Sequence, residues 1–92
     1  MNKIILISEI GWNHMGDMNL AKKMIQSSAE NGADLCKFQT WSEGKLKPGA
    51  WDNDGRREIY EKAQISENDH YFLMDVCKKN SVQFLTSVFN IN

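Results

Sequence analysis

The chain has 92 residues, the size of one small domain with a single core, and such a domain buries about 65% of its unfolded surface. Its 11 Lys and Arg against 12 Asp and Glu give a net charge of -1, and no long block of like charge indicates a nucleic-acid-binding arm or a polybasic membrane patch. The longest apolar run, residues 4–7, is far shorter than a signal peptide core of roughly 7–15 residues or a transmembrane helix of about 20. We therefore expect a soluble, cytoplasmic protein with no nucleic-acid or membrane partner.

The first predicted elements are a strand, a glycine-rich turn and a helix. Residues 3–10 (KIILISEI) form a nearly continuous apolar, β-branched run, which is typical of a strand covered on both faces. Residues 11–16 contain two glycines and predict a turn. Asp17 then provides an N-cap for a helix with apolar residues at helical spacing, and this helix is expected to end near Asn31 with Gly32 after it.

The second predicted strand covers residues 34–41 (DLCKFQTW). Its alternation places one set of side chains, Leu35, Lys37 and Gln39, on one face, and Cys36 and Phe38 on the other. Cys36 and the later Cys77 form no CxxC or Cys/His spacing, and isolated cysteines on apolar segments usually pack as small hydrophobic side chains in a reducing compartment. We expect two buried thiols; a ligand or nucleophile is the alternative, which no neighbouring residue supports.

A long polar loop follows at residues 42–65, with a short helix expected at 57–64, since loops of this length without structure are uncommon unless they are functional. Because it follows the second strand, we expect the loop to lie over the catalytic face. Arg56, Arg57 and Tyr60 are its candidate contacts to a sugar or a lid. The alternative is a solvated, charged surface.

The last elements are a helix and a strand. Ser66 and Asp69 resemble a capping box with Asp in place of the usual Glu, and apolar residues follow on one helix face until the helix stops near Asn80. Residues 82–89 (VQFLTSVF) have the composition of a strand. The order β-α-β-α-β predicts a parallel sheet with helical crossovers, either an open flavodoxin-like sheet or the opening of an eight-stranded barrel. A barrel needs about 250 residues, so this chain would be its first part.

Polar residues stand at the carboxyl ends of all three predicted strands. These are Glu9 in the first strand, Lys37 and Gln39 in the second, and Thr86 and Ser87 in the third. Functional groups of parallel α/β proteins collect at these ends, so we expect all five to point toward one rim, with Glu9, Lys37 and Ser87 converging at one end of a sheet ordered 1-2-3. A buried Glu9–Lys37 ion pair without a catalytic task is the alternative. Asn13 and His14, between two glycines of the first loop, would either hold a ligand or stabilise the helix start.

Two runs of sequence resemble long motifs of the sialic acid synthase family, which includes the legionaminic and pseudaminic acid synthases. Residues 8–17 (SEIGWNHMGD) are similar to the family opening A-E-I-G-x-N-H-x-G-D/S. Residues 32–40 (GADLCKFQT) are similar to the second-strand motif G-A-D-x-x-K-F-Q-T. The resemblance covers essentially the whole chain, and residues 42–65 align least well.

The third-strand match is looser. Residues 84–90 (FLTSVFN) are similar to the family motif F-x-S-T-P-F-D. However, Thr86 and Ser87 reverse the Ser-Thr order, and Val88 and Asn90 replace the proline and the aspartate. These departures leave the third strand as the weakest part of the resemblance.

The resemblance implies a TIM (β/α)8 barrel, followed in the family by a small antifreeze-like domain. Such enzymes condense phosphoenolpyruvate with an N-acylated amino sugar such as N-acetylmannosamine. C3 of phosphoenolpyruvate attacks the sugar aldehyde, water adds to the resulting cation at C2, and phosphate leaves. A divalent metal, Mn2+ or Mg2+, activates the aldehyde, and the full-length relatives are expected to be homodimers.

The motifs also imply roles for four of the strand-end residues. Lys37 matches the family lysine that contacts phosphoenolpyruvate, and Ser87 stands where a hydroxyl does likewise. An ammonium and a hydroxyl at adjacent strand ends can hold a small carboxylate or phosphate. Glu9 matches the rim glutamate beside the substrates, and Gln39 is expected to orient Lys37 or a ligand.

Asn13 and His14 match the first motif and are expected in the substrate site, but the metal-binding histidines of the family come from later strands, so neither is assigned to a metal. The catalytic glutamate, both metal histidines and the C-terminal domain have no counterpart in residues 1–92. We therefore expect the N-terminal segment of a nonulosonic acid synthase without a complete second domain, inactive alone. The alternative is a non-catalytic module that binds a small phosphorylated ligand, or a gene remnant.

Overall fold

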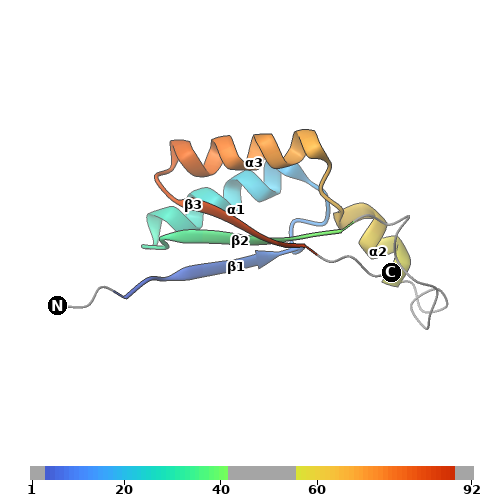
Figure 1. The fold of residues 1–92 in the computed structure, drawn as a ribbon, viewed down its shortest axis with the longest axis horizontal. Coiled ribbons are helices and arrows are strands. Elements are labelled where there is room, and N and C mark those ends of the chain that lie inside the picture. The colour runs from blue at the N-terminus through green and yellow to red at the C-terminus, as the bar shows by residue number, and fades with distance from the viewer. Residues whose placement is uncertain (1–3, 42–55, 89–92) are drawn as a thin grey trace.

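The computed structural model describes residues 4–41 and 56–88, and in these residues three parallel strands form one sheet in the order β1-β2-β3. Helices α1 and α3 lie together on one face of this sheet, and α2 lies beyond the ends of the strands (Figure 1). The elements are β1 (Ile7–Gly11), α1 (Met18–Glu30), β2 (Leu35–Thr40), α2 (Arg56–Ala63), α3 (Glu67–Lys79) and β3 (Gln83–Val88). The predicted order of elements and of strands is confirmed.

The register of the sheet sets which residues lie side by side. Glu9 of β1 is the partner of Lys37, and Lys37 is the partner of Leu85 in β3. Two residues further along, Gln39 is the partner of Ser87. The pairing of β1 shifts between Glu9 and Gly11, so the strand bulges at its carboxyl end. A bulge of this kind bends the strand and increases its local twist.

Helix α1 begins and ends as the sequence predicts. The Asp17 carboxylate accepts hydrogen bonds from the backbone N–H groups of Asn19 and Leu20, at 2.9 and 3.1 Å. At the other end, the Ala33 N–H donates to the Ser28 carbonyl and the Gly32 N–H to the Ala29 carbonyl, which is a Schellman motif. Gly32 has a φ of +93°, a conformation that glycine adopts without the steric cost of a Cβ atom.

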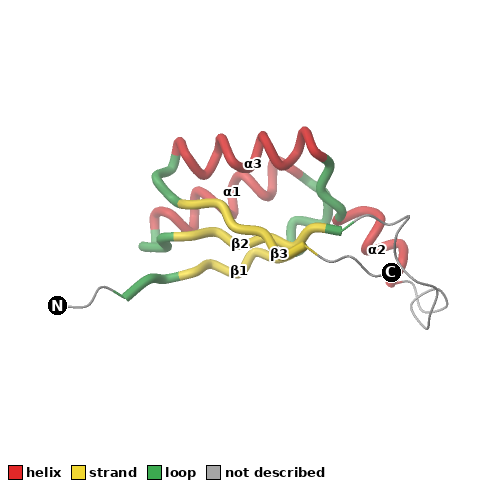
Figure 2. The backbone as a smooth tube through the Cα atoms, viewed as in Figure 1, coloured by secondary structure: helices red, strands yellow, loops and turns green. Residues whose placement is uncertain are grey.

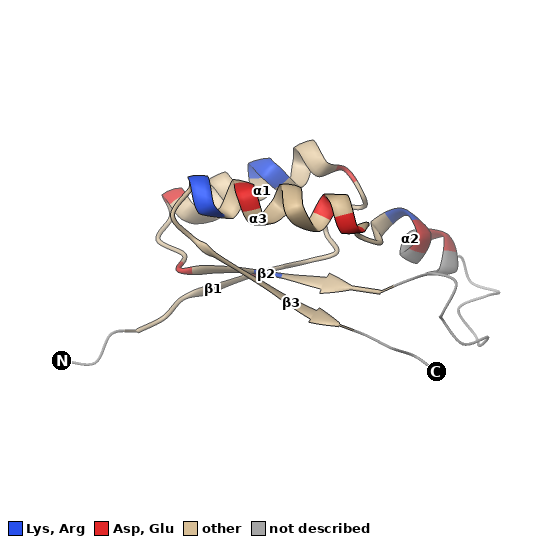
Figure 3. Cartoon of the chain, turned by 45° about the horizontal axis from the view of Figure 1, so that its top comes forward, with Lys and Arg blue, Asp and Glu red and all other residues tan. Residues whose placement is uncertain are grey.

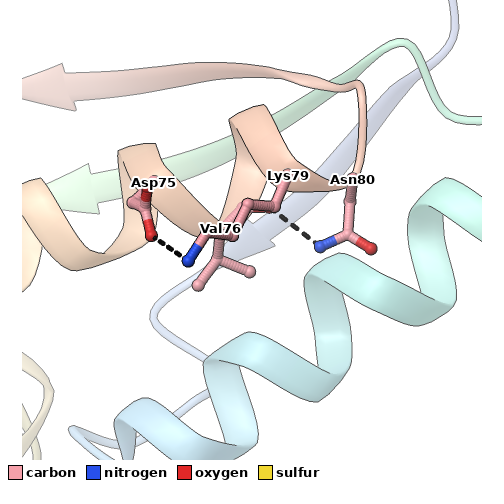
Figure 4. Close-up of polar contacts among 4 residues, drawn as sticks. All are labelled: Asp75, Val76, Lys79 and Asn80. Atoms are coloured by element: carbon pink, nitrogen blue, oxygen red, sulfur yellow. Dashed lines mark hydrogen bonds and ion pairs between the residues drawn. The ribbon is translucent and has the colours of Figure 1, made fainter.

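Helix α3 repeats this pattern with different residues. The capping box of Ser66 and Asp69 is confirmed, with both reciprocal hydrogen bonds present. Figure 4 shows the other end, where Lys79 pairs with Asp75 at 2.9 Å and the Asn80 side chain donates to the Val76 carbonyl at 2.8 Å. The same Schellman bonds follow, but the left-handed position is taken by Ser81, with a φ of 59°. Both helices therefore end at an asparagine, in agreement with the predicted boundaries.

The core lies between the sheet and these two helices. Its buried side chains come from β1, β2, α1, α3 and the segments next to them, and they are Ile10, Ala21, Ile25, Cys36, Phe38, Ile65, Leu73, Val76, Cys77 and Val82. The predicted burial of both thiols is confirmed. Burial raises the pKa of the Cys77 thiol to about 12, so this sulfur stays protonated and is a poor nucleophile. In the described residues, no helix is long and apolar enough to cross a membrane.

The first strand departs from its prediction. It begins at Ile7 instead of residue 3, and Ile4 and Ile5 are 78% and 62% exposed. The prediction assumed cover on both faces, whereas α1 and α3 cover only one face of this sheet (Figure 1). Helix α2 matches the predicted short helix to within one residue. Residues 42–55, and the side chains of Arg56, Arg57 and Tyr60, lie outside what the structure describes, so the expectation that they contact substrate stays a prediction.

Candidate functional site

The candidate site lies on the face of the sheet that turns away from α1 and α3. Strand alternation puts Lys37 and Gln39 on this open face, because their neighbours Cys36 and Phe38 are fully buried against the helices. The predicted facing of β2 is therefore confirmed. Charged residues are concentrated on the helices (Figure 3), and the three strands contain two of them, Glu9 and Lys37, which lie side by side.

The Glu9–Lys37 ion pair is loose and partly solvated. The Lys37 Nζ lies 3.4 Å from the Glu9 Oε2, and the side chains are 32% and 54% exposed. A charge-assisted hydrogen bond is shorter, about 2.7–2.9 Å. Among the described residues the pair is therefore not buried, and the alternative that it has no catalytic task stays a prediction. Because exposed pairs contribute about 0–1 kcal/mol, a small anion can compete with Glu9 for the ammonium group.

Gln39 and Ser87 continue the polar surface toward the carboxyl ends of the strands. They are register partners, so their side chains leave the sheet on the same face as Lys37. Gly11 completes the surface on the β1 side: a Cβ there would lie 3.8 Å from Gln39 Cδ and 3.9 Å from Glu9 Oε1. We call Glu9, Lys37, Gln39 and Ser87 the strand-end cluster. The predicted strand order is confirmed, and the register places Glu9 beside Lys37 and Gln39 beside Ser87. The carboxyl ends of these strands lie near α2 (Figure 2).

Thr86 does not belong to the strand-end cluster, and here the prediction of a common rim is wrong. Its Oγ1 lies 2.6 Å from the Oγ1 of Thr40, which in turn lies 2.8 Å from Nε2 of His70 on α3. Adjacent residues of a strand face opposite sides, so Thr86 must turn toward the helices if Ser87 faces the open side. Sequence reasoning missed Thr40 and His70. The alternation of Thr40 with Gln39 could have shown that Thr40 faces the helices, but no local pattern marks His70, whose partner Thr40 lies 30 residues away.

The structure separates the two loop residues Asn13 and His14. Asn13 is exposed, and its side-chain amide donates to the Ile10 carbonyl at 2.9 Å. His14 is fully buried on the core side, where its ring lies 6.0 Å from that of Phe38. Its Nδ1 accepts a hydrogen bond from the Gly16 N–H at 2.9 Å, so the proton of the neutral ring is on Nε2, which has no partner among the described residues. Both residues fix the loop that follows Glu9, and His14 faces the core instead of the open face.

The burial of His14 predicts a loss of stability in mild acid. Burial lowers its pKa below the usual 6.5, and the Asp69 carboxylate partly offsets this shift. The His14 ring therefore binds a proton near pH 6.5 in the unfolded chain, but only at a lower pH in the folded chain. Stability is complete above that pH and falls as the pH drops below it, by at most about 1.4 kcal/mol per pH unit for one proton.

We would measure urea midpoints at pH 7.5 and 5.5 for the wild type and for His14→Asn, whose amide oxygen can replace the Nδ1 acceptor. The variant should be less stable at pH 7.5, because a buried ring is lost, but its stability should depend less on pH. An equal acid loss in both proteins would show that His14 is not the responsible group.

The described fold and the strand-end cluster define an α/β protein with a parallel sheet whose polar groups collect at the strand carboxyl ends. The chain belongs to the NeuB family, whose model matches residues 24–92. The resemblance to sialic acid synthases drawn from the sequence motifs is thereby confirmed.

Individual relatives agree with this family. The chain is 31% identical to an N,N'-diacetyllegionaminic acid synthase of Legionella pneumophila over 92% of its length, and 28% identical to a pseudaminic acid synthase of Campylobacter jejuni over 95%. The crystal structure of an N-acetylneuraminic acid (sialic acid) synthetase from Leptospira borgpetersenii, in complex with citrate, superposes on 98% of the chain with a TM-score of 0.84 at 27% identity. The chain spans 27%, 29% and 30% of these three proteins.

Proposed function

We propose that the chain is the N-terminal segment of a nonulosonic acid synthase, which condenses phosphoenolpyruvate with an N-acylated amino sugar such as N-acetylmannosamine and releases phosphate. In this reaction, a bond forms between C3 of phosphoenolpyruvate and the sugar aldehyde carbon, water adds at C2, and the C2–O bond to phosphate breaks. The observation that carries the proposal is the position of Lys37. It is the one cation in the three described strands, its side chain is 32% exposed on the open face, and its Nζ lies 3.4 Å from Glu9, which is longer than a strong ion pair.

Each member of the strand-end cluster has a proposed role in holding an anion. The Lys37 ammonium group would bind a carboxylate or phosphate oxygen of phosphoenolpyruvate, and the Ser87 hydroxyl would donate a hydrogen bond to the same ligand. Gln39, the register partner of Ser87, would orient these groups. Glu9 would keep Lys37 in place before the substrate binds and then face the sugar. These four residues would bind and position substrate, and we propose no catalytic residue among them.

Asn13 and His14 would contribute through the loop that joins β1 to α1. Asn13 fastens this loop to Ile10, and His14 fastens it at Gly16. Ile10 directly follows Glu9, so the two bonds hold the backbone beside the strand-end cluster. This is an indirect role, whereas the resemblance implied that both residues belong to the substrate site itself.

The metal, the partners and the location are proposals as well. In the part of the chain that the structure describes, no three His, Cys, Asp or Glu side chains gather to hold a metal ion. We propose that Mn2+ or Mg2+ binds residues outside this chain, where it would activate the sugar aldehyde. We propose further that the barrel and a second domain are completed by sequence beyond these residues, and that the whole enzyme is a cytoplasmic homodimer.

The test is the reaction of the complete synthase, by which we mean a full-length NeuB-family protein whose N-terminal segment is this sequence. Phosphate release from phosphoenolpyruvate should require the amino sugar, and mass spectrometry should detect a nine-carbon acid. N-acetylmannosamine and the amino sugars used by legionaminic and pseudaminic acid synthases would be compared. Residues 1–92 alone should release no phosphate. Binding of phosphoenolpyruvate without release, for every sugar, would favour the non-catalytic module instead.

A further inference from the structure

A chain of hydroxyl groups runs behind the strand-end cluster, on the helix side of the sheet. The Thr86 Oγ1 lies 2.6 Å from the Thr40 Oγ1, and the Thr40 Oγ1 lies 2.8 Å from the His70 Nε2. The His70 Nδ1 lies 2.7 Å from the carbonyl oxygen of Ser66, the N-cap of α3. The chain therefore links β3, β2 and the first turn of α3 through three short hydrogen bonds.

The chemistry of the four groups fixes the direction of these bonds. A backbone carbonyl can only accept, so the His70 Nδ1 must carry the proton and donate it to Ser66. In the neutral ring, Nε2 then has a lone pair and accepts from the Thr40 hydroxyl, and Thr40 in turn accepts from Thr86. The ring is also held from the side, because it meets Phe84 edge-on at a centroid distance of 6.2 Å. His70 thus has one orientation and one neutral tautomer.

The backbone carries this restraint to the open face. Thr40 directly follows Gln39, and Thr86 directly precedes Ser87, while Gln39 and Ser87 are register partners. The hydroxyl pair joins β2 to β3 immediately beside these two residues, where the sheet ends at Thr40 and Val88. A strand end without such a bond is free to fray, and its outward-facing side chains then lose their orientation.

We propose that His70 is a positioning residue, which acts through Thr40 and Thr86 to hold Gln39 and Ser87 at the spacing needed for binding phosphoenolpyruvate. This inference rests on the proposed function and adds a residue that does not touch the ligand. Misplacement of a binding group weakens binding even when the group itself is unchanged. This positioning role depends on the hydroxyl group of Thr40, which makes both hydrogen bonds, and not on its methyl group.

The test compares two substitutions of Thr40 in the complete synthase. Thr40→Val keeps the shape and removes the hydroxyl, so the KM for phosphoenolpyruvate should rise about fivefold to tenfold, the equivalent of one hydrogen bond. Thr40→Ser keeps the hydroxyl and should stay within about twofold of the wild type. Ser28→Ala is the matched control, because it breaks another hydroxyl pair, Ser8–Ser28 at 2.8 Å, and should lower the urea midpoint without changing this KM.

The outcomes separate the inference from the proposed function. If Thr40→Val leaves the KM unchanged while Lys37→Met raises it, the positioning role is overturned and the proposed function stands. If neither changes the KM, both fail. A second measurement holds even if Thr40→Val does not fold: nitrogen-15 NMR of the unaltered protein should show His70 protonated on Nδ1 and His14 on Nε2. A neutral His70 protonated on Nε2 would overturn the hydroxyl chain directly.

Discussion

Replacing Lys37 by methionine in the complete synthase is expected to weaken the use of phosphoenolpyruvate by roughly tenfold to more than a hundredfold. The substitution removes a charge-assisted hydrogen bond to a bound anion, which contributes on the order of 1.5–3 kcal/mol. Methionine nearly preserves the alkyl stem, so packing should change little. The measurement is phosphoenolpyruvate affinity together with the urea midpoint on the same purified variant.

The exposure of the Glu9–Lys37 pair sharpens this prediction. Loss of a buried partner would destabilise the fold by roughly 3–5 kcal/mol, but loss of an exposed one costs about 0–1 kcal/mol. Glu9 is 54% exposed in the described residues, so for residues 1–92 carrying Lys37→Met the urea midpoint should stay close to that of the wild-type segment. Lys79→Met is the control, because it breaks the exposed Asp75 ion pair and should leave phosphoenolpyruvate affinity intact. A large fall in the midpoint of Lys37→Met with unchanged affinity would defeat the assignment of Lys37 as a substrate ligand.

The largest expected loss of stability follows from Gly16→Ala. A Cβ at Gly16 would lie 1.8 Å from the carbonyl oxygen of Lys62 and 2.9 Å from its carbonyl carbon. The obstacle is the backbone of α2, so the loop or the helix must move. Gly16 also has a φ of +82°, which strains any residue with a Cβ. Together these effects should lower the free energy of unfolding by roughly 2–4 kcal/mol, measured by urea denaturation.

Gly32→Ala is the matched control for this loss. Gly32 also has a positive φ, +93°, but a Cβ there would meet nothing within 4 Å. Its substitution should therefore cost only the backbone term, about 1–2 kcal/mol. The difference between the two variants measures the close approach of the first loop to α2. Equal losses would mean that the loop and α2 are not packed against each other as described.

Local signals predicted most of the fold. The N-cap at Asp17, the capping box at Ser66 and the two asparagine ends depend on a few consecutive residues, and each lies where the sequence placed it. The facing of β2 was equally readable, because a period of two residues fixes which side chains are buried. The family motifs then implied how the strands are arranged in one sheet, which these local patterns cannot show.

The errors arose where a conclusion depended on contacts between distant segments. An apolar composition could not show that, among the described residues, the helices cover one face of β1 only, and the strand is shorter than predicted. Thr86 was grouped with Ser87 because both end the strand, although alternation forces them apart. His70 was missed because its partner Thr40 lies 30 residues away, and no local pattern predicts that contact. The strand positions of the cluster residues agree with the prediction because three short polar patterns end at the same edge of one sheet, and their binding role stays a prediction.

The most direct test of a phosphoenolpyruvate site at the strand ends is a crystal structure of the complete synthase with phosphoenolpyruvate bound. Lys37 Nζ should lie about 2.7–3.2 Å from a carboxylate or phosphate oxygen of the ligand, and the Ser87 hydroxyl should contact the same molecule. Phosphoenolpyruvate bound elsewhere, with Lys37 still paired only to Glu9, would contradict the proposed site.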